Sequence, residues 1–88
     1  LTIGDKMGTS KEDIRDWFKT GVKSGATHLL IVCDTYDWED YPVAVMPNQN
    51  IHDVIDKFSG KNMQKVMEVY NLSKDMDAQL NMRRAWEI

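Results

Sequence analysis

Apolar residues recur at helical spacing near the start of the chain. Ser10 offers a hydroxyl N-cap before this stripe, and Gly25 is placed to end it in a left-handed cap. The pattern predicts an amphipathic helix over residues 10–24. Residues 1–9 have two glycines and no periodicity, which predicts a flexible arm. The apolar stripe consists of Ile14, Trp17, Phe18 and Val22.

Two apolar runs follow, one on each side of an acidic loop. Residues 27–34 are rich in β-branched side chains and are apolar on both faces, which favours a strand. Residues 41–46 form the returning strand. Pro42 lacks an amide donor and therefore belongs at a strand start or on an edge strand. Together the two runs predict an antiparallel β-hairpin.

Helical spacing returns in the second half of the chain. Asn50 precedes a stripe that stops before Gly60, and residues 61–72 repeat the spacing. The predicted class is therefore α+β, a small single domain over residues 1–88 with the order αββαα. Residues 73–88 are an uncertain tail with a short helix through Met76 and Leu80. The third helix would turn Met63, Val66, Met67 and Tyr70 inward.

A two-stranded hairpin with two apolar faces raises a packing problem. Such a hairpin is marginal in water, and helices on one side would leave its second face wet. Either the tail crosses that face or another subunit covers it. Because oligomerisation is a common remedy in small domains, we expect a homo-oligomer, most simply a dimer.

Composition narrows the classes of function. The 88 residues carry a net charge of −3, which disfavours a nucleic-acid polymer as partner. The apolar run at residues 29–33 is far shorter than the roughly 20 residues of a membrane span, so no membrane contact is expected. The single Cys33 lies in that run and indicates a buried thiol in a reducing cytoplasm.

The hairpin loop concentrates acidic and aromatic side chains. Its carboxylates could chelate a hard cation, but they lack the glycine and terminal glutamate of an EF-hand, so no metal is expected. A solvated tip whose aspartates bond to turn amides explains most of these acids better. The strand-end position of Asp34 indicates a defined hydrogen-bonding role. The acids are Asp34, Asp37, Glu39 and Asp40, and the rings are Tyr36, Trp38 and Tyr41.

The rings offer a second interpretation, which is stacking on a base or another planar group. Carboxylates beside them would accept hydrogen bonds, and cations from elsewhere in the chain would meet phosphate. Each of these cations also fits a plain role, as a solvated lysine or a C-terminal ion pair. The predicted ligand-binding residues are Asp34, Thr35, Tyr36, Asp37, Trp38, Lys61, Arg83 and Arg84.

Catalytic signatures are sparse. His28 and Cys33 would lie on opposite faces of one strand, a poor geometry for a nucleophilic pair. The sequence has no zinc spacing, phosphate-loop glycines or nucleophile elbow. We therefore expect no catalytic residues, no cofactor and no enzyme activity.

The string VCDTYDWEDYPV, residues 32–43, resembles small proteins of bacteriophages and bacteria with a similar hairpin core. GKNMQKVMEVYNL, residues 60–72, extends the resemblance. That group has no established function, so the resemblance implies no residue roles. It does imply a viral protein of the host cytoplasm, similar in size to phage proteins that sequester nucleotide signals against host defence.

The leading hypothesis is a non-enzymatic, oligomeric protein that sequesters a nucleotide-like small molecule. One alternative is an inhibitor that docks on a host protein through the acidic-aromatic tip, where aromatic anchors ringed by charge would suit a binding hot spot. Another alternative is an enzyme that depends on a divalent metal held by the four loop acids.

Overall fold

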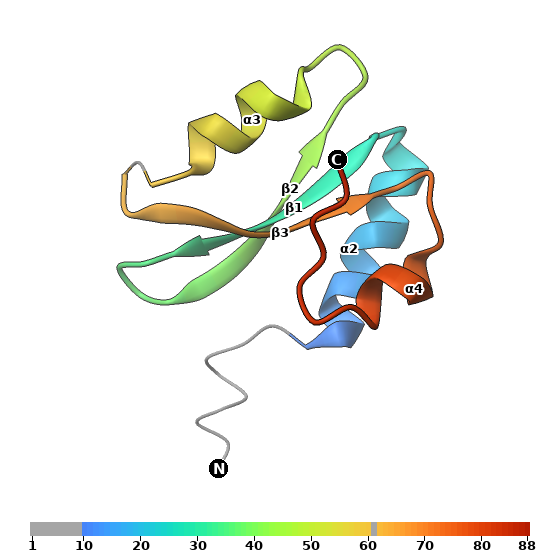
Figure 1. The fold of residues 1–88 in the computed structure, drawn as a ribbon, viewed down its shortest axis with the longest axis horizontal. Helices are drawn as coiled ribbons and strands as arrows, with labels where there is room; N and C mark the ends of the chain where they lie inside the picture. Colours follow the sequence, from blue (N-terminus) through green and yellow to red (C-terminus); the bar gives the residue numbers. More distant parts are fainter. Residues whose placement is uncertain (1–9, 61) are drawn as a thin grey trace.

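The computed structural model describes residues 10–60 and 62–88 as one sheet with helices on both faces (Figure 1). The predicted arm, residues 1–9, lies outside the described residues. The helices are α2 (Lys11–Ser24), α3 (Ile51–Phe58) and α4 (Met76–Leu80), and the strands are β1 (His28–Asp34), β2 (Glu39–Val45) and β3 (Gln64–Asn71).

The sheet is antiparallel, with the strand order β2-β1-β3. The central strand β1 is apolar on both faces, because helices pack against both faces of the sheet. At its end Asp34 lies opposite Glu39 on one side and Gln64 on the other. Pro42 pairs with Ile31 on the edge strand β2, which confirms that it belongs on an edge.

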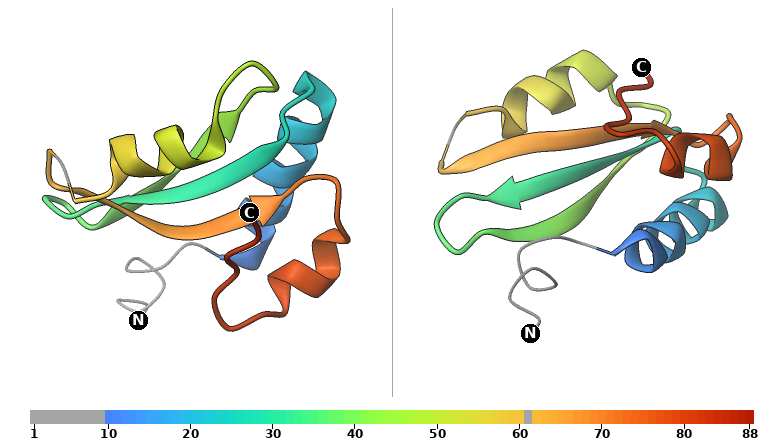
Figure 2. Two further views of the ribbon diagram at one scale, coloured as in Figure 1. Left: turned by 45° about the horizontal axis from the view of Figure 1, so that its top comes forward. Right: turned by 60° about the horizontal axis from the view of Figure 1, so that its bottom comes forward.

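Helices cover both faces of the sheet (Figure 2). On the side of α2 and α4, the buried residues are Ile14, Phe18, Leu29, Ile31, Tyr70, Leu80 and Ala85. On the side of α3, they are Leu30, Val32, Val45, Val54, Val66 and Val69. The alternation of β1 side chains between the faces feeds both clusters. The second face, which the sequence argument left uncovered, is therefore covered by α3.

The α+β class, the hairpin and the predicted caps are confirmed. Ser10 Oγ accepts a hydrogen bond from the Asp13 amide, and Gly25 ends α2 at a φ of 84°. Asn50 Oδ1 accepts from the His52 and Asp53 amides at the start of α3. The short helix through Met76 and Leu80 also forms, as α4.

The predicted third helix is wrong, because residues 64–71 form strand β3. The order of elements is thus αββαβα. A bulge explains the error: Ile31 pairs with Glu68 but Val32 pairs with Val66, so Met67 is an extra residue in the ladder. The bulge places Val66 and Val69 on one face at a spacing of three, which imitates a helical stripe.

The C-terminal tail packs along the open edge of β3. The Val69 amide donates to the Ala85 carbonyl at 3.0 Å, and the Glu87 amide donates to the Val69 carbonyl at 2.9 Å, around a parallel bridge between Val69 and Trp86. Ala85 is fully buried in the cluster on the α2 side. The tail thus blunts an edge that would otherwise expose unpaired backbone groups.

Candidate functional site: the hairpin tip and the loop before β3

The β1–β2 loop is held by its own aspartates. Asp34 Oδ1 accepts a hydrogen bond from the Tyr36 amide at 2.8 Å, and Asp37 Oδ1 accepts one from the Glu39 amide at 3.1 Å. The Trp38 amide donates to the Asp34 carbonyl at 2.7 Å. Asp34 and Asp37 therefore act in the turn, as the solvated-tip interpretation predicts.

A second loop, the one before β3, is bonded to the hairpin tip. The Thr35 amide and hydroxyl both donate to the Met63 carbonyl, at 2.7 and 2.8 Å. The next residue, Gln64, donates from Nε2 to the Tyr41 hydroxyl on β2. The Gly60 amide donates to the Gln64 carbonyl and closes the second loop. The two loops thus form one structural unit at the end of the sheet.

Backbone strain is concentrated in this unit. Within the described ranges, the non-glycine residues with positive φ are Trp38 at 61°, Asn62 at 53° and Met63 at 60°. Asparagine tolerates this conformation, whereas a bulky residue costs roughly 1–2 kcal/mol there. Glycine would satisfy the same backbone at Trp38 and Met63 without this cost. The chain therefore holds two large side chains at positions that its backbone does not favour.

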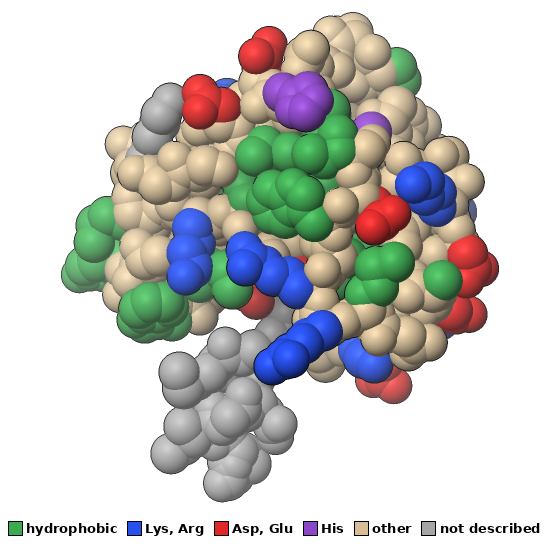
Figure 3. All heavy atoms as spheres, in the orientation of Figure 1, with side chains coloured by type: hydrophobic (Ala, Val, Ile, Leu, Met, Phe, Trp, Pro, Cys, Tyr) green, Lys and Arg blue, Asp and Glu red, His purple; other side chains and the backbone are tan. Residues whose placement is uncertain are grey.

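The strained residues Trp38 and Met63 are exposed, and so is the neighbouring Tyr36. The exposed fractions are 77% for Tyr36, 53% for Trp38 and 57% for Met63. Figure 3 shows hydrophobic side chains at the end of the sheet where the hairpin loop lies. We call Tyr36, Trp38 and Met63 the tip surface. It is an apolar projection, not a hollow, and it is carried on two bonded loops.

Carboxylates share the hairpin loop with Tyr36 and Trp38. Asp37 and Glu39 are exposed there, and Asp34 and Asp40 are half-buried at the strand ends. The exposed Lys65 follows on β3, where it lies one residue further into the sheet. The hairpin loop itself, residues 34–40, thus carries four carboxylates and no basic side chain, which complements a basic partner.

Cys33 lies just inside this region and is buried. Burial, and then the hydrogen bond and negative charge of Asp40, raise the pKa of its thiol above the usual range. The thiol is therefore protonated at neutral pH and is a poor nucleophile. His28 stands at the other end of β1, where its Nε2 lies 3.0 Å from the Ile88 carbonyl oxygen.

The predicted ligand residues fall into separate places. Residues 34–38 are brought together at the tip, whereas Lys61 lies outside the described residues. Arg84 Nε donates to the carbonyl of Met67, in the middle of β3. Met67 is four residues from Met63, or about 13 Å along a strand. Arg84 is therefore held at the middle of the sheet edge and does not join the tip.

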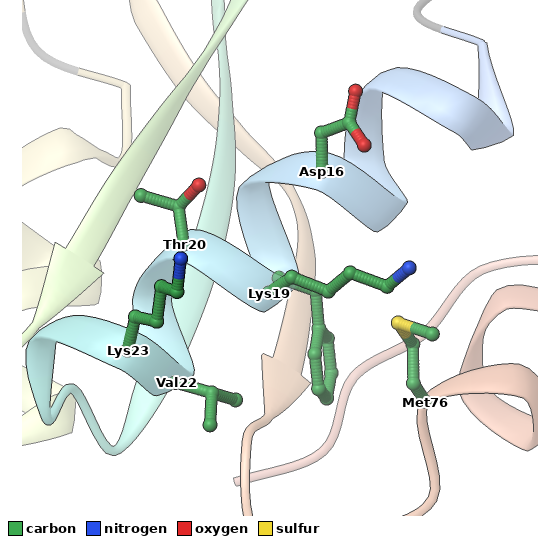
Figure 4. A pocket seen from close by; sticks show the side chains of 7 residues that line it. Asp16, Lys19, Thr20, Val22, Lys23 and Met76 are labelled. Atoms are coloured by element: carbon green, nitrogen blue, oxygen red, sulfur yellow. The ribbon is translucent and has the colours of Figure 1, made fainter.

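A hollow of about 550 Å³ lies between α2 and α4 (Figure 4). Phe18, Val22 and Met76 form its apolar wall, and Val22 is exposed although its spacing predicts burial. The ammonium groups of Lys19 and Lys23 point to different sides of α2. No polar groups of this wall converge on one point, so the hollow lacks the arrangement that fixes a small ligand.

The described parts of the chain contain no candidate metal site. No group of three His, Cys, Asp or Glu side chains there is arranged to hold a metal ion. No described helix is long and apolar enough to cross a membrane.

Sequence reasoning missed Met63 and Asn62, which it placed inside a helix. The signal was present as Gly60 and Asn62, two residue types that tolerate positive φ, shortly before the β-branched and aromatic residues Val66, Val69 and Tyr70. Such a pair is typical of a loop that precedes a strand.

Comparisons of the chain with protein-family models, curated proteins and solved structures find no match. The resemblance of residues 32–43 and 60–72 to small phage and bacterial proteins therefore stays an expectation.

Proposed function

We propose that this is a non-enzymatic binding protein that docks on a basic protein surface through its tip surface. The supporting observation is the strained, exposed placement of Trp38 and Met63 on two loops that are bonded to each other. Backbone strain in bulky residues is typical of sites selected for something other than stability. Exposed aromatic and methionine side chains ringed by charge are typical of binding hot spots.

The shape of the site favours a macromolecular partner. Tyr36 and Trp38 project from the end of the sheet, so a partner with an apolar cleft would enclose them. The exposed carboxylates of Asp37 and Glu39 would then face the rim of that cleft. Lysine and arginine side chains on the rim would speed association and make it sensitive to salt.

The nucleotide-like ligand expected from the sequence has less support at this tip. The rings and carboxylates are present, but Arg84 is bonded to the Met67 carbonyl instead. Sequestration of such a molecule stays a prediction, and so does action against host defence by a phage protein.

The homo-oligomer also stays a prediction, but its original reason is removed because α3 covers the second face. Pro42 leaves the open edge of β2 without an amide donor at its middle, so pairing of two sheets through that edge is disfavoured. Native mass spectrometry at micromolar concentration measures the oligomeric state directly.

Site-specific photo-crosslinking tests the docking function. A photoreactive amino acid replaces Tyr36 in one variant and Met82 in a control variant, since Met82 is exposed but lies after α4. In cells that express the protein, we expect one defined adduct from position 36 and none from position 82. Equal labelling from both positions, or no adduct from position 36, would overturn the proposal.

A further inference from the structure

Trp86 is held as a rigid platform on the edge of the sheet. The backbone bonds on both sides of Val69 fix residues 85 and 87, and Ala85 is fully buried toward α2. Because successive side chains of an extended segment alternate, Trp86 faces the α3 side. Its side chain is 42% exposed, so one part of the indole is open to solvent.

Arg84 is held beside this platform. Its Nε donates at 2.8 Å to the carbonyl of Met67, the extra residue of the bulge. Its guanidinium carbon lies 5.8 Å from the centre of the Trp86 ring. The two terminal nitrogens of a guanidinium still carry four N–H donors when Nε is engaged. Arg84 is thus oriented and retains donors for an anion.

A hollow of about 340 Å³ is lined by Arg84 and Trp86. The hollow is open to solvent, so a small molecule bound there would keep one side exposed. Figure 3 shows apolar side chains gathered in the middle of the face, where the C-terminal segment passes α3, with Lys and Arg side chains beside them. Arg83 is exposed next to the hollow in the chain.

The charges near the hollow favour an anion. Glu87 follows Trp86 in the chain, and its carboxylate pairs with Lys74 at 3.3 Å. The positive charge of Arg84 has no ion pair within the described residues, and neither has that of Arg83. An indole face with adjacent guanidinium donors suits a molecule with a planar ring and a phosphate group.

We propose that Arg84 and Trp86 form a binding site for a small nucleotide, whose base stacks on the indole and whose phosphate accepts from the guanidinium. The site lies apart from the tip surface and does not depend on the docking function. In this proposal the aromatic ring that stacks on the base is Trp86, which lies beside Arg84, and not a ring of the hairpin tip.

Isothermal titration calorimetry of the whole chain with adenosine monophosphate tests this site. We expect a Kd below about 1 mM, at least tenfold weaker binding by Arg84→Gln, and unchanged binding by Trp38→Ala. Arg84→Lys keeps the positive charge but loses the planar set of guanidinium donors that can bind phosphate in a bidentate way. This variant should bind with intermediate affinity. Inorganic phosphate should bind at least about tenfold more weakly, because it lacks the base.

Trp86→Phe is a variant that should lose affinity without losing the fold. This variant keeps an apolar ring at the bridge, and its thermal unfolding should match that of the parent while its nucleotide affinity falls. The proposal is overturned if none of the four common nucleoside monophosphates binds below about 1 mM, or if Arg84→Gln and Trp38→Ala bind alike. Tighter binding of a single-stranded oligonucleotide, with steep salt dependence, would also overturn it.

Discussion

Thr35 donates two hydrogen bonds to one acceptor, the carbonyl oxygen of Met63, from its amide at 2.7 Å and from its hydroxyl at 2.8 Å. This pair joins residues that are 28 positions apart in the chain. It fixes the hairpin tip to the loop before β3, and it brings the side chains of Tyr36, Trp38 and Met63 to the same end of the sheet. The tip surface depends on this junction.

Replacing Thr35 tests the junction. Thr35→Val keeps the shape of the side chain but removes the hydroxyl donor, and it should lower the free energy of unfolding by about 0.5–1.5 kcal/mol. Thr35→Ser keeps the donor and is the matched control. Urea unfolding compares them. If the two variants unfold alike, the hydroxyl bond does not hold the loops together.

Relieving the strained backbone at Met63 should stabilise the protein, whereas Thr35→Val should destabilise it. Glycine at a φ of 60° relieves a cost of roughly 1–2 kcal/mol, and the greater freedom of the unfolded chain offsets about half of it. Met63→Gly should therefore raise the free energy of unfolding by about 0.5–1 kcal/mol. Met63→Ala, which keeps the strain, is the control and should not stabilise the protein.

The two sides of α2 should respond differently to truncation. Phe18 is buried and meets Tyr70 edge to face, with 6.4 Å between ring centres. Phe18→Ala should cost about 3–5 kcal/mol, as is typical of a large core side chain. Val22→Ala should change stability by less than about 0.5 kcal/mol, since Val22 lies exposed in the hollow between α2 and α4. Thermal unfolding of both variants measures this contrast, and a large loss at Val22 would contradict the placement.

Alkaline pH should destabilise the fold. Burial, and then the charge and hydrogen bond of Glu68, raise the pKa of Tyr70 above its ordinary value of 10.0, and burial raises the pKa of Cys33 above 9.0. The unfolded chain therefore loses these protons at lower pH than the folded chain. The stabilisation that these groups contribute is complete below about pH 9 and is lost as the pH rises through the folded values.

Urea unfolding between pH 7 and 11 measures this loss for the parent and for Tyr70→Phe. The variant lacks the phenol, so its stability should fall less steeply above pH 10, the ordinary pKa of the tyrosine phenol. Lysines and other groups titrate in both proteins and cancel in the comparison. Identical slopes would show that Tyr70 does not retain its proton through burial.

Much of the fold could be predicted because the deciding signals are local. Ser10, Gly25 and Asn50 mark helix ends by capping chemistry, which a single sequence displays. The two apolar faces of β1 predicted a cover on each face of the strand, but they did not predict its central position, because β3 was expected to be a helix. By contrast, β3 could not be identified by periodicity, because the extra residue Met67 breaks the alternation of its buried side chains.

The tip was predicted in composition but not in extent. Residues 34–38 could be recognised from the sequence because acidic and aromatic side chains are concentrated there. Met63 joins them only through hydrogen bonds between distant loops, which no local pattern encodes. Arg84 was grouped with the tip because sequence cannot show that a bulge carbonyl at Met67 would bind it.

The affinity of the Met63→Gly variant for the partner captured through position 36 tests the docking function most directly. We expect this variant to be more stable than the parent yet to bind the purified partner at least about tenfold more weakly, while Met82→Ala binds as the parent does. Unchanged affinity in Met63→Gly would contradict the claim that strain at this loop is kept in order to present a docking surface.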